Sequence, residues 1–362
     1  MKTSVIGFPR VGTLRELKFA SEKYFRKETG AEKLLKEARR LRKTHWTVQK
    51  EAGIDYIPCN DFSFYDTVLD TAVLLGIVPK RYRELNIIPK RYQELQLNSL
   101  DQYFAMARGY QGENGDVKAL AMKKWFNTNY HYIVPEAEDD TKIALVGEKL
   151  WEEYEEAKAL GIETKPVLTG PYTLLKLCRY TGSKTADDFT DAVIAAYQQV
   201  LEKCAAHRIM WLQLDEPALV RDLSKEDIAL FHKIYENVLP CKKTVEILLQ
   251  TYFGDVRDIY KDLTELPFDG IGLDFIEGKE TVHLIEKYGF PKDKLLFAGL
   301  VNGKNIWRNH YDRTLNQLQQ LTGKGIQTVL STSCSLLHVP YTVKHETKLS
   351  EKYLDYFAFA EE

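Results

Sequence analysis

The sequence lacks the features that mark a membrane, secreted or disulfide-stabilised protein. No apolar run in its 362 residues approaches the roughly 20 residues that a membrane-spanning helix needs, and the apolar stretch at the N-terminus is too short for a secretion signal. The five cysteines are scattered and odd in number, which favours reduced thiols over a disulfide framework. We therefore expect a cytoplasmic protein that does not insert into a membrane.

The sequence also lacks the short motifs of several common sites. It contains no C-x-x-C, H-E-x-x-H or His-x-Cys pattern for zinc, no P-loop, no G-x-S-x-G elbow, and no G-x-G-x-x-G after a strand. Cys334 and His338 are close in sequence, but packing explains that spacing better than metal binding does. The formal net charge of −2 gives no case for nucleic acid as a main partner.

What the sequence does contain is an alternation of short apolar runs with stretches of helical period. Helices are expected, for example, at 186–206 and 225–238. Eight such units in one chain favour a closed (β/α)8 TIM barrel over a doubly wound open sheet, and we treat residues 1–362 as a single barrel domain. The expected strands lie near 3–8, 54–59, 165–169, 209–214, 244–249, 270–275, 294–300 and 326–331.

The gap between the second and third expected strands, about residues 62–164, predicts a long helical insertion after strand 2. Long ordered insertions after a barrel strand usually lie at the functional face. Expected helices cover 65–76, 99–109 and 142–160. A tandem near-repeat, residues 78–87 and 88–97, is interpreted as a local duplication without an assigned function.

The C-terminal stretch 353–360 is apolar and helix-like. We expect it to be a helix that packs against a further segment.

A basic strand-to-helix turn follows the first expected strand. Residues 1–53 carry 14 Lys+Arg against 6 Asp+Glu, and Arg15 and Lys18 share a helix face near Arg10. Side chains and helix-start amides there predict an anion site. The later basic run, residues 36–43, is interpreted as a solvated helix face.

A second cationic cluster lies at residues 118–132, where Lys123 and Lys124 precede several aromatic and amide side chains. Cations could bind carboxylates there while rings cover a heterocycle. The competing interpretation is an aromatic-rich helix end packed as core.

Asp215 and Glu216 follow the fourth expected strand and are the best acid/base candidates by position. The alternative is that one of them caps the next helix or pairs with Arg221.

Eight longer motifs resemble cobalamin-independent methionine synthase, in order and through nearly the whole chain, but they match only the amino-terminal half of that family. The resemblance implies two (β/α)8 barrels meeting face to face, of which this chain is the first and the carboxy-terminal catalytic barrel is absent. The motifs are GFPRVG (7–12), RELK (15–18), IDYIPCNDFSFYD (54–66), MKKWFNTNYHYIVPE (122–136), KPVLTGPYT (165–173), LQLDEPAL (212–219), AGLVNGKNIWR (298–308) and STSCSLLHVP (331–340).

The family transfers the methyl group of 5-methyltetrahydrofolate polyglutamate to homocysteine, forming methionine without cobalamin. The resemblance further implies that a zinc ion binds the homocysteine sulfur, with ligands in the second barrel and none in this chain. This half alone is then expected to be inactive, with the carboxy-terminal barrel and the folate as its partners.

The family's folate-binding positions match Arg15, Glu16, Leu17, Lys18 and Lys124. No catalytic residue is expected here, and Cys334, Asp215 and Glu216 are interpreted as remnants or structural residues.

Two other functions remain open from the sequence. One is an autonomous barrel decarboxylase or hydrolase using Asp215 and Glu216. The other is a non-enzymatic polyanion-binding module using residues 10–43, although no aromatic-basic stripe supports it.

Overall fold

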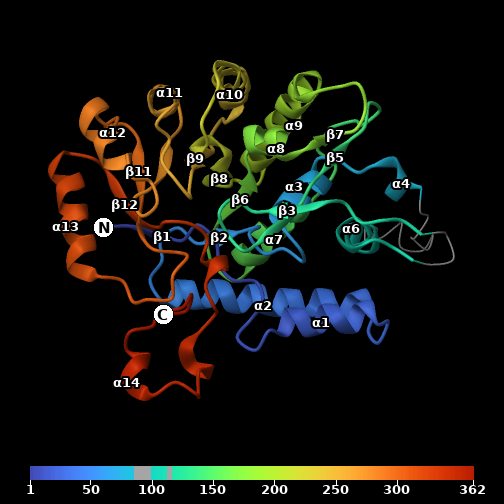
Figure 1. Ribbon diagram of the computed structural model, residues 1–362, viewed down its shortest axis with the longest axis horizontal. Coiled ribbons are helices and arrows are strands. Elements are labelled where there is room, and N and C mark those ends of the chain that lie inside the picture. The colour runs from blue at the N-terminus through green and yellow to red at the C-terminus, as the bar shows by residue number, and fades with distance from the viewer. Residues whose placement is uncertain (85–98, 112–115) are drawn as a thin grey trace.

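Eight parallel strands form the centre of the fold in the computed structural model, which describes residues 1–84, 99–111 and 116–362 (Figure 1). Their order is β1-β12-β11-β10-β9-β8-β6-β2, and a parallel bridge from Ser4 to Tyr56 joins the two edges. The Tyr56 amide donates to Thr3 O at 3.0 Å, so the ring is closed. The strands are β1 (Thr3–Ser4), β2 (Pro58–Cys59), β6 (Lys165–Thr169), β8 (Trp211–Asp215), β9 (Glu246–Gln250), β10 (Gly270–Asp274), β11 (Leu295–Val301) and β12 (Thr328–Thr332).

This confirms the predicted barrel, and each expected strand overlaps an observed one. The first two strands are much shorter than expected. Pro58, at the start of β2, has no amide hydrogen for the ladder. Side chains alternate between the barrel interior, where Trp211, Leu248 and Phe297 pack together, and the outer face, where Leu212 and Leu249 are fully buried.

Helices surround the ring (Figure 1). The helices expected at 186–206 and 225–238 have those bounds, because capping boxes begin them at Thr185 and Ser224. No helix among the described residues is long and apolar enough to cross a bilayer. The helices are α1 (Glu16–Phe25), α2 (Ala31–Glu51), α3 (Thr67–Leu74), α4 (Lys80–Arg83), α6 (Ser99–Arg108), α7 (Lys149–Ala159), α8 (Pro171–Leu177), α9 (Ala186–Ala206), α10 (Lys225–Val238), α11 (Tyr260–Glu265), α12 (Thr281–Tyr288), α13 (Tyr311–Gly323) and α14 (Glu351–Leu354).

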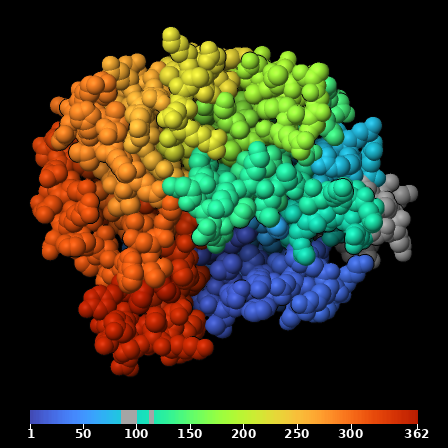
Figure 2. Space-filling view, viewed as in Figure 1, coloured from blue at the N-terminus to red at the C-terminus, as the bar shows by residue number. Residues whose placement is uncertain are grey.

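The insertion is mixed rather than purely helical. It contains α3 and α6 as expected, and also a hairpin of β3 (Met122–Lys124) with β4 (His131–Ile133) that the sequence interpretation missed. A short strand β5 (Glu136–Ala137) pairs with β7 (Arg179–Tyr180). Figure 2 shows this part of the insertion, in teal, over the middle of the face between the blue N-terminal helices and the green segments.

The third expected helix of the insertion begins late. Helix α7 starts at Lys149 because residues before it run extended beside α3, where Val146 N donates to Leu74 O at 2.9 Å. The second copy of the tandem repeat, residues 88–97, lies outside the described residues.

The expected C-terminal helix is wrong. Helix α14 ends at Leu354, and Phe357 instead forms an antiparallel bridge with Trp307, their rings stacked at 5.1 Å. Phe357 therefore packs against the loop that follows β11, whereas Ala360 packs in a separate buried cluster with Phe8 and Tyr341.

The basic run 36–43 is only partly the solvated face that was expected. Arg42 is buried, and its guanidinium lies 2.5 Å from Glu156 Oε2 and 3.6 Å from Glu153 Oε1. This ion pair joins α2 to α7, whereas Arg39 of the same helix is exposed.

Replacing Arg42 with methionine should lower the free energy of unfolding by about 1–3 kcal/mol, because Glu156 and the buried Glu153 lose the guanidinium while Lys149 Nζ stays 3.2 Å from Glu153. Urea unfolding measures the change. The matched control, Arg39→Met on the exposed side of α2, should change stability by less than about 0.5 kcal/mol. Equal changes in the free energy of unfolding for the two substitutions would show that the ion pair between α2 and α7 does not stabilise the fold.

Candidate functional site

The loop after β1 meets the β3–β4 hairpin at the rim where the barrel strands end. The Arg10 guanidinium donates to Ser63 O at 2.8 Å, which anchors this loop to the one after β2. A cavity of about 40 Å³ is lined by Arg10 together with Trp125, Tyr130 and His131 of the hairpin. The loop that carries Arg10 and the turn of the β3–β4 hairpin are therefore neighbours, whereas Arg15, Lys18 and Lys124 do not line this cavity.

Arg15 and Lys18 present their charges to solvent at the start of α1. Arg15 is the residue before the helix and adopts a left-handed conformation, with φ of 64°. Lys18 lies 3.6 Å from Glu22 one turn later. Both side chains are exposed, so an anion could approach them with little loss of their hydration.

The helix-start amides are less available than the sequence suggested. The amide of Arg15 donates to Gly12 O, and that of Leu17 donates to Val11 O at 3.2 Å. The amide of Leu14 donates to the Glu16 carboxylate at 3.0 Å. Recognition of an anion here therefore depends on the side chains more than on the backbone.

Glu16 and Leu17 differ from their neighbours. The Glu16 carboxylate folds back onto the turn and lies 3.6 Å from Arg40 of α2. Leu17 is 3% exposed and packs in a core cluster with Leu34 and Leu41. Of the four-residue run, Arg15 and Lys18 are exposed, Glu16 is partly exposed and Leu17 is buried.

Lys124 ends β3, opposite His131 of β4, and is exposed. The residues after it form the hairpin turn, so the aromatic cluster is not the helix end considered from sequence. Trp125 packs edge-on against Phe126 at 4.9 Å and Tyr132 at 5.8 Å, next to the core. These rings support the hairpin, and Lys124 extends from it.

Glu216 is fully buried and holds backbone in place. Its carboxylate accepts hydrogen bonds from the amides of Tyr172, at 3.0 Å, and Thr173, at 2.6 Å, and from the Tyr235 hydroxyl at 2.5 Å. It therefore caps the start of α8, the helix before it in sequence and not the next one. Burial raises the pKa of Glu216 to about 7.

The neighbouring strand-end carboxylates are also engaged. Asp215 accepts from the Gln213 amide at 2.7 Å and the Tyr252 hydroxyl at 3.1 Å, and burial raises its pKa to about 7. Asp274 accepts from three amides between 2.7 and 2.9 Å, including that of Phe253. These groups satisfy donors of the protein itself.

Cys334 and His338 lie at the end of β12 without the arrangement of a metal site. Burial raises the pKa of the Cys334 thiol well above its ordinary value. His338 packs edge-on between Tyr130 and Phe253, and burial lowers its pKa to about 4. In the part of the chain that the structure describes, no group of three or more His, Cys, Asp or Glu is placed to bind a metal ion.

Sequence comparison assigns most of the chain to one family. The family described as cobalamin-independent synthase, N-terminal domain, matches residues 2–325. A 5-methyltetrahydropteroyltriglutamate–homocysteine methyltransferase of Campylobacter jejuni subsp. doylei is 55% identical over all 362 residues of this chain. The match covers 47% of that relative's length. The enzyme of the same name from Streptococcus suis is 56% identical, with 46% of it covered. The chain thus spans about half the length of these relatives.

Solved structures support the fold. A putative vitamin-B12-independent methionine synthase from Listeria monocytogenes has a TM-score of 0.62 at 16% identity, covering 93% of this chain and 92% of its own. A B12-independent methionine synthase from a Shewanella species has a TM-score of 0.61 at 13% identity, covering 97% of this chain and 93% of its own.

Glu216 should make stability depend on pH. Its raised pKa means that the folded protein retains a proton that the unfolded chain releases, so the free energy of unfolding should fall as pH rises from about 4.5 to about 7. Glu216→Gln should flatten this dependence and destabilise the protein at pH 5 by about 1–3 kcal/mol, because the amide nitrogen cannot accept a hydrogen bond.

Denaturant unfolding at several pH values measures both effects. Glu152→Gln, at an exposed position on α7, is the control and should leave the pH dependence unchanged. An unaltered slope in Glu216→Gln would mean that this carboxyl ionises as it does in the unfolded chain.

Proposed function

Because this chain belongs to the cobalamin-independent synthase family, as its N-terminal domain, we propose that it forms the folate-binding half of a methionine synthase. The methyl donor is 5-methyltetrahydrofolate carrying a polyglutamate tail, and the acceptor is homocysteine. The name shared by its relatives specifies a triglutamate. The observation that carries the proposal is the exposed pair Arg15 and Lys18 at the start of α1, which follows the loop that carries Arg10.

The surface of α1 suits a ligand that is anionic along a tail and apolar elsewhere. Leu14 is 59% exposed and Phe19 is 50% exposed, directly beside the two cations. A polyglutamate has several carboxylates that can pair with such cations, while the exposed apolar side chains favour contact with a methylene or ring. Leu17 contributes by fixing the helix in the core, and Glu16 by holding the turn.

The hairpin supplies the second contact of the proposed site. Lys124 is exposed beside rings that pack on the core, and the cavity shared with Arg10 joins the hairpin to the loop that precedes α1. A ligand lying across the mouth would meet cations from both segments. Two separate cationic contacts would also set the register of a flexible tail.

The chemistry of methyl transfer requires groups that we assign to the other half of the relatives. Zinc would make the homocysteine thiolate available near neutral pH. We place its ligands, with the catalytic barrel, in the portion of the relatives that this chain does not span. Unpaired cysteines fit a reducing compartment such as the cytoplasm.

The alternative functions have less support. Asp215 and Glu216, the acid and base of the hydrolase alternative, are engaged by protein donors and do not line the cavity at the mouth. For a polyanion-binding module, Arg42 and Arg40 of the basic region are already paired with carboxylates.

Binding of 5-methyltetrahydrofolate triglutamate should be tighter than that of the monoglutamate at low salt, and the preference should shrink as salt rises. Lys18→Ala and Lys124→Ala should each weaken triglutamate binding by about 1–2 kcal/mol, roughly 5–30-fold, through loss of a charge-assisted contact. Isothermal titration calorimetry of both ligands measures these differences.

Lys23 and Lys123 provide matched controls. Lys23 is exposed on α1 away from the Arg15–Lys18 face, and Lys123 precedes Lys124 on the opposite face of β3. Alanine at either position should leave the triglutamate preference intact. Equal affinities for the two ligands in the unaltered chain at low salt would contradict the proposed tail site.

A further inference from the structure

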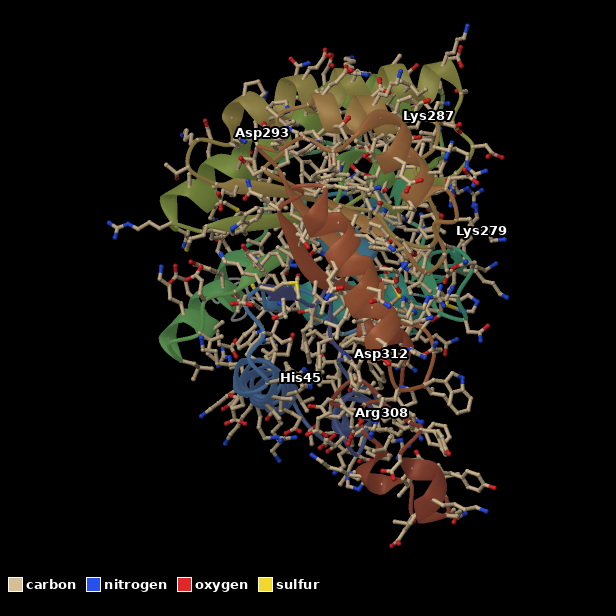
Figure 3. All side chains as sticks on the ribbon, turned by 90° about the vertical axis from the view of Figure 1, so that its left-hand side faces the viewer. His45, Lys279, Lys287, Asp293, Arg308 and Asp312 are labelled. Atoms are coloured by element: carbon tan, nitrogen blue, oxygen red, sulfur yellow. The ribbon has the colours of Figure 1, made fainter. Side chains whose placement is uncertain are left out.

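The turn between β3 and β4 reaches the far side of the barrel mouth. Figure 3 shows the barrel from the side, with Lys279 of the loop after β10 on the right and Asp293, which precedes β11, on the left. The teal insertion lies on the right, where the strands end. There the ring of Phe126 in the turn packs at 5.9 Å on Phe253, which follows β9, and the Arg221 guanidinium lies 4.7 Å over the Phe126 ring.

The order of the strands shows how far the hairpin extends. The hairpin is inserted after β2, and in the closed ring β10 is the fourth strand from β2 in either direction. A hairpin that contacts the loop after β10 therefore spans the whole mouth. This position also accounts for the burial of Cys334, which packs in one cluster with Phe253 beneath the rings of the turn.

Three polar side chains tie the tip of the hairpin to the far side. Asn127 Nδ2 donates to Glu277 Oε2, in the loop after β10, at 2.6 Å. Lys304 Nζ, in the loop after β11, donates to Asn127 Oδ1 at 3.0 Å and lies 2.6 Å from Glu277 Oε1. Each of the three side chains contacts the other two, and we call this trio the latch. The amide of Asn127 suits its place, because it supplies a donor for the carboxylate and an acceptor for the ammonium.

The hairpin is held at its base as well. The Ile133 amide donates to the Asp66 carboxylate at 3.0 Å, on the side of β2. Between base and tip the hairpin has little support of its own, since β3 is three residues long and fully exposed. A two-stranded hairpin of this size is marginally stable by itself. Its position over the mouth therefore depends on the contacts at its two ends.

We propose that Asn127, Glu277 and Lys304 are positioning residues for the polyglutamate tail, because the latch fixes the hairpin that carries Lys124. Lys124 ends β3 and lies three residues before Asn127. A cation on a fixed strand loses less conformational freedom when it pairs with a carboxylate than a cation on a moving strand does. The inference rests on the tail site proposed above and adds the loops after β10 and β11 to it.

The test measures triglutamate and monoglutamate binding by calorimetry and hydrogen–deuterium exchange of residues 122–133 by mass spectrometry. Asn127→Ala removes both hydrogen bonds of the tip and leaves the ion pair between Glu277 and Lys304. It should accelerate exchange in the hairpin and weaken triglutamate binding by about 3–10-fold, while monoglutamate binding changes by less than about twofold. The control is Lys324→Glu, which breaks an exposed ion pair with Glu286 of α12 and should change neither readout.

Two further variants separate positioning from general destabilisation. In a Lys124→Ala background, Asn127→Ala should weaken triglutamate binding no further, because both changes act through one contact. Glu277→Lys and Lys304→Glu should each act like Asn127→Ala, since each places two like charges together. The two combined should restore both readouts, because the Asn127 amide can rotate to meet the reversed pair.

The unaltered chain distinguishes failure of the latch from failure of the tail site. If it prefers the triglutamate and Asn127→Ala keeps the full preference, the positioning role is wrong and the tail site stands. Unchanged exchange of residues 122–133 in Glu277→Lys would also overturn the positioning role. Equal affinities of the unaltered chain for the two ligands would contradict the tail site and, with it, the role assigned to the latch.

Discussion

Closure of the eight-stranded ring is the constraint on which the other features depend. Tyr56, just before β2, donates to Thr3 O and accepts from Val5 N, and these two hydrogen bonds join the first strand to the second, so all eight strands end at one rim. The loop after β1 and the hairpin inserted after β2 are consequently neighbours, although Lys18 and Lys124 are more than a hundred residues apart. An anion-binding surface made from both segments requires a closed barrel and would not form on the edge of an open sheet.

The same rim shows why a buried carboxylate with a raised pKa does not by itself mark a catalyst. Glu216 directly follows β8 and Asp274 ends β10, at the position where barrel enzymes carry catalytic groups, and burial raises the pKa of each. Their oxygens are nevertheless occupied by amides and a tyrosine hydroxyl. The strands give way to loops at this rim, and some buried backbone amides there have no partner in the sheet. Because water does not reach these amides, a protein group must accept their hydrogen bonds.

The distribution of charge and of apolar surface distinguishes two surfaces on the outside of the barrel. Around α1, exposed cations lie beside exposed Leu14 and Phe19, a combination suited to a small anionic ligand. Between α2 and α13 lies a groove of about 850 Å³, lined by apolar side chains such as Leu315 and Leu318 and by charged ones such as Arg308 and Glu361. The first surface supports the proposed substrate site.

The sequence by itself determined the barrel, because strand and helix periods and the capping residues of α9 and α10 are local properties. It also singled out Arg15, Lys18 and Lys124 as candidate anion-binding residues, through charge asymmetry and family motifs, and all three are exposed in the structure. Tertiary structure decided what local patterns leave open. Leu17 lies in the core, Arg42 forms a buried ion pair with α7, and residues 118–132 include a hairpin. The environment of each of these residues depends on a segment that is distant in the sequence. The role of Glu216 also depends on tertiary structure. A carboxylate at the end of a strand can act as a catalyst or cap a helix, and the closed ring decides which hydrogen-bond donors lie close to it.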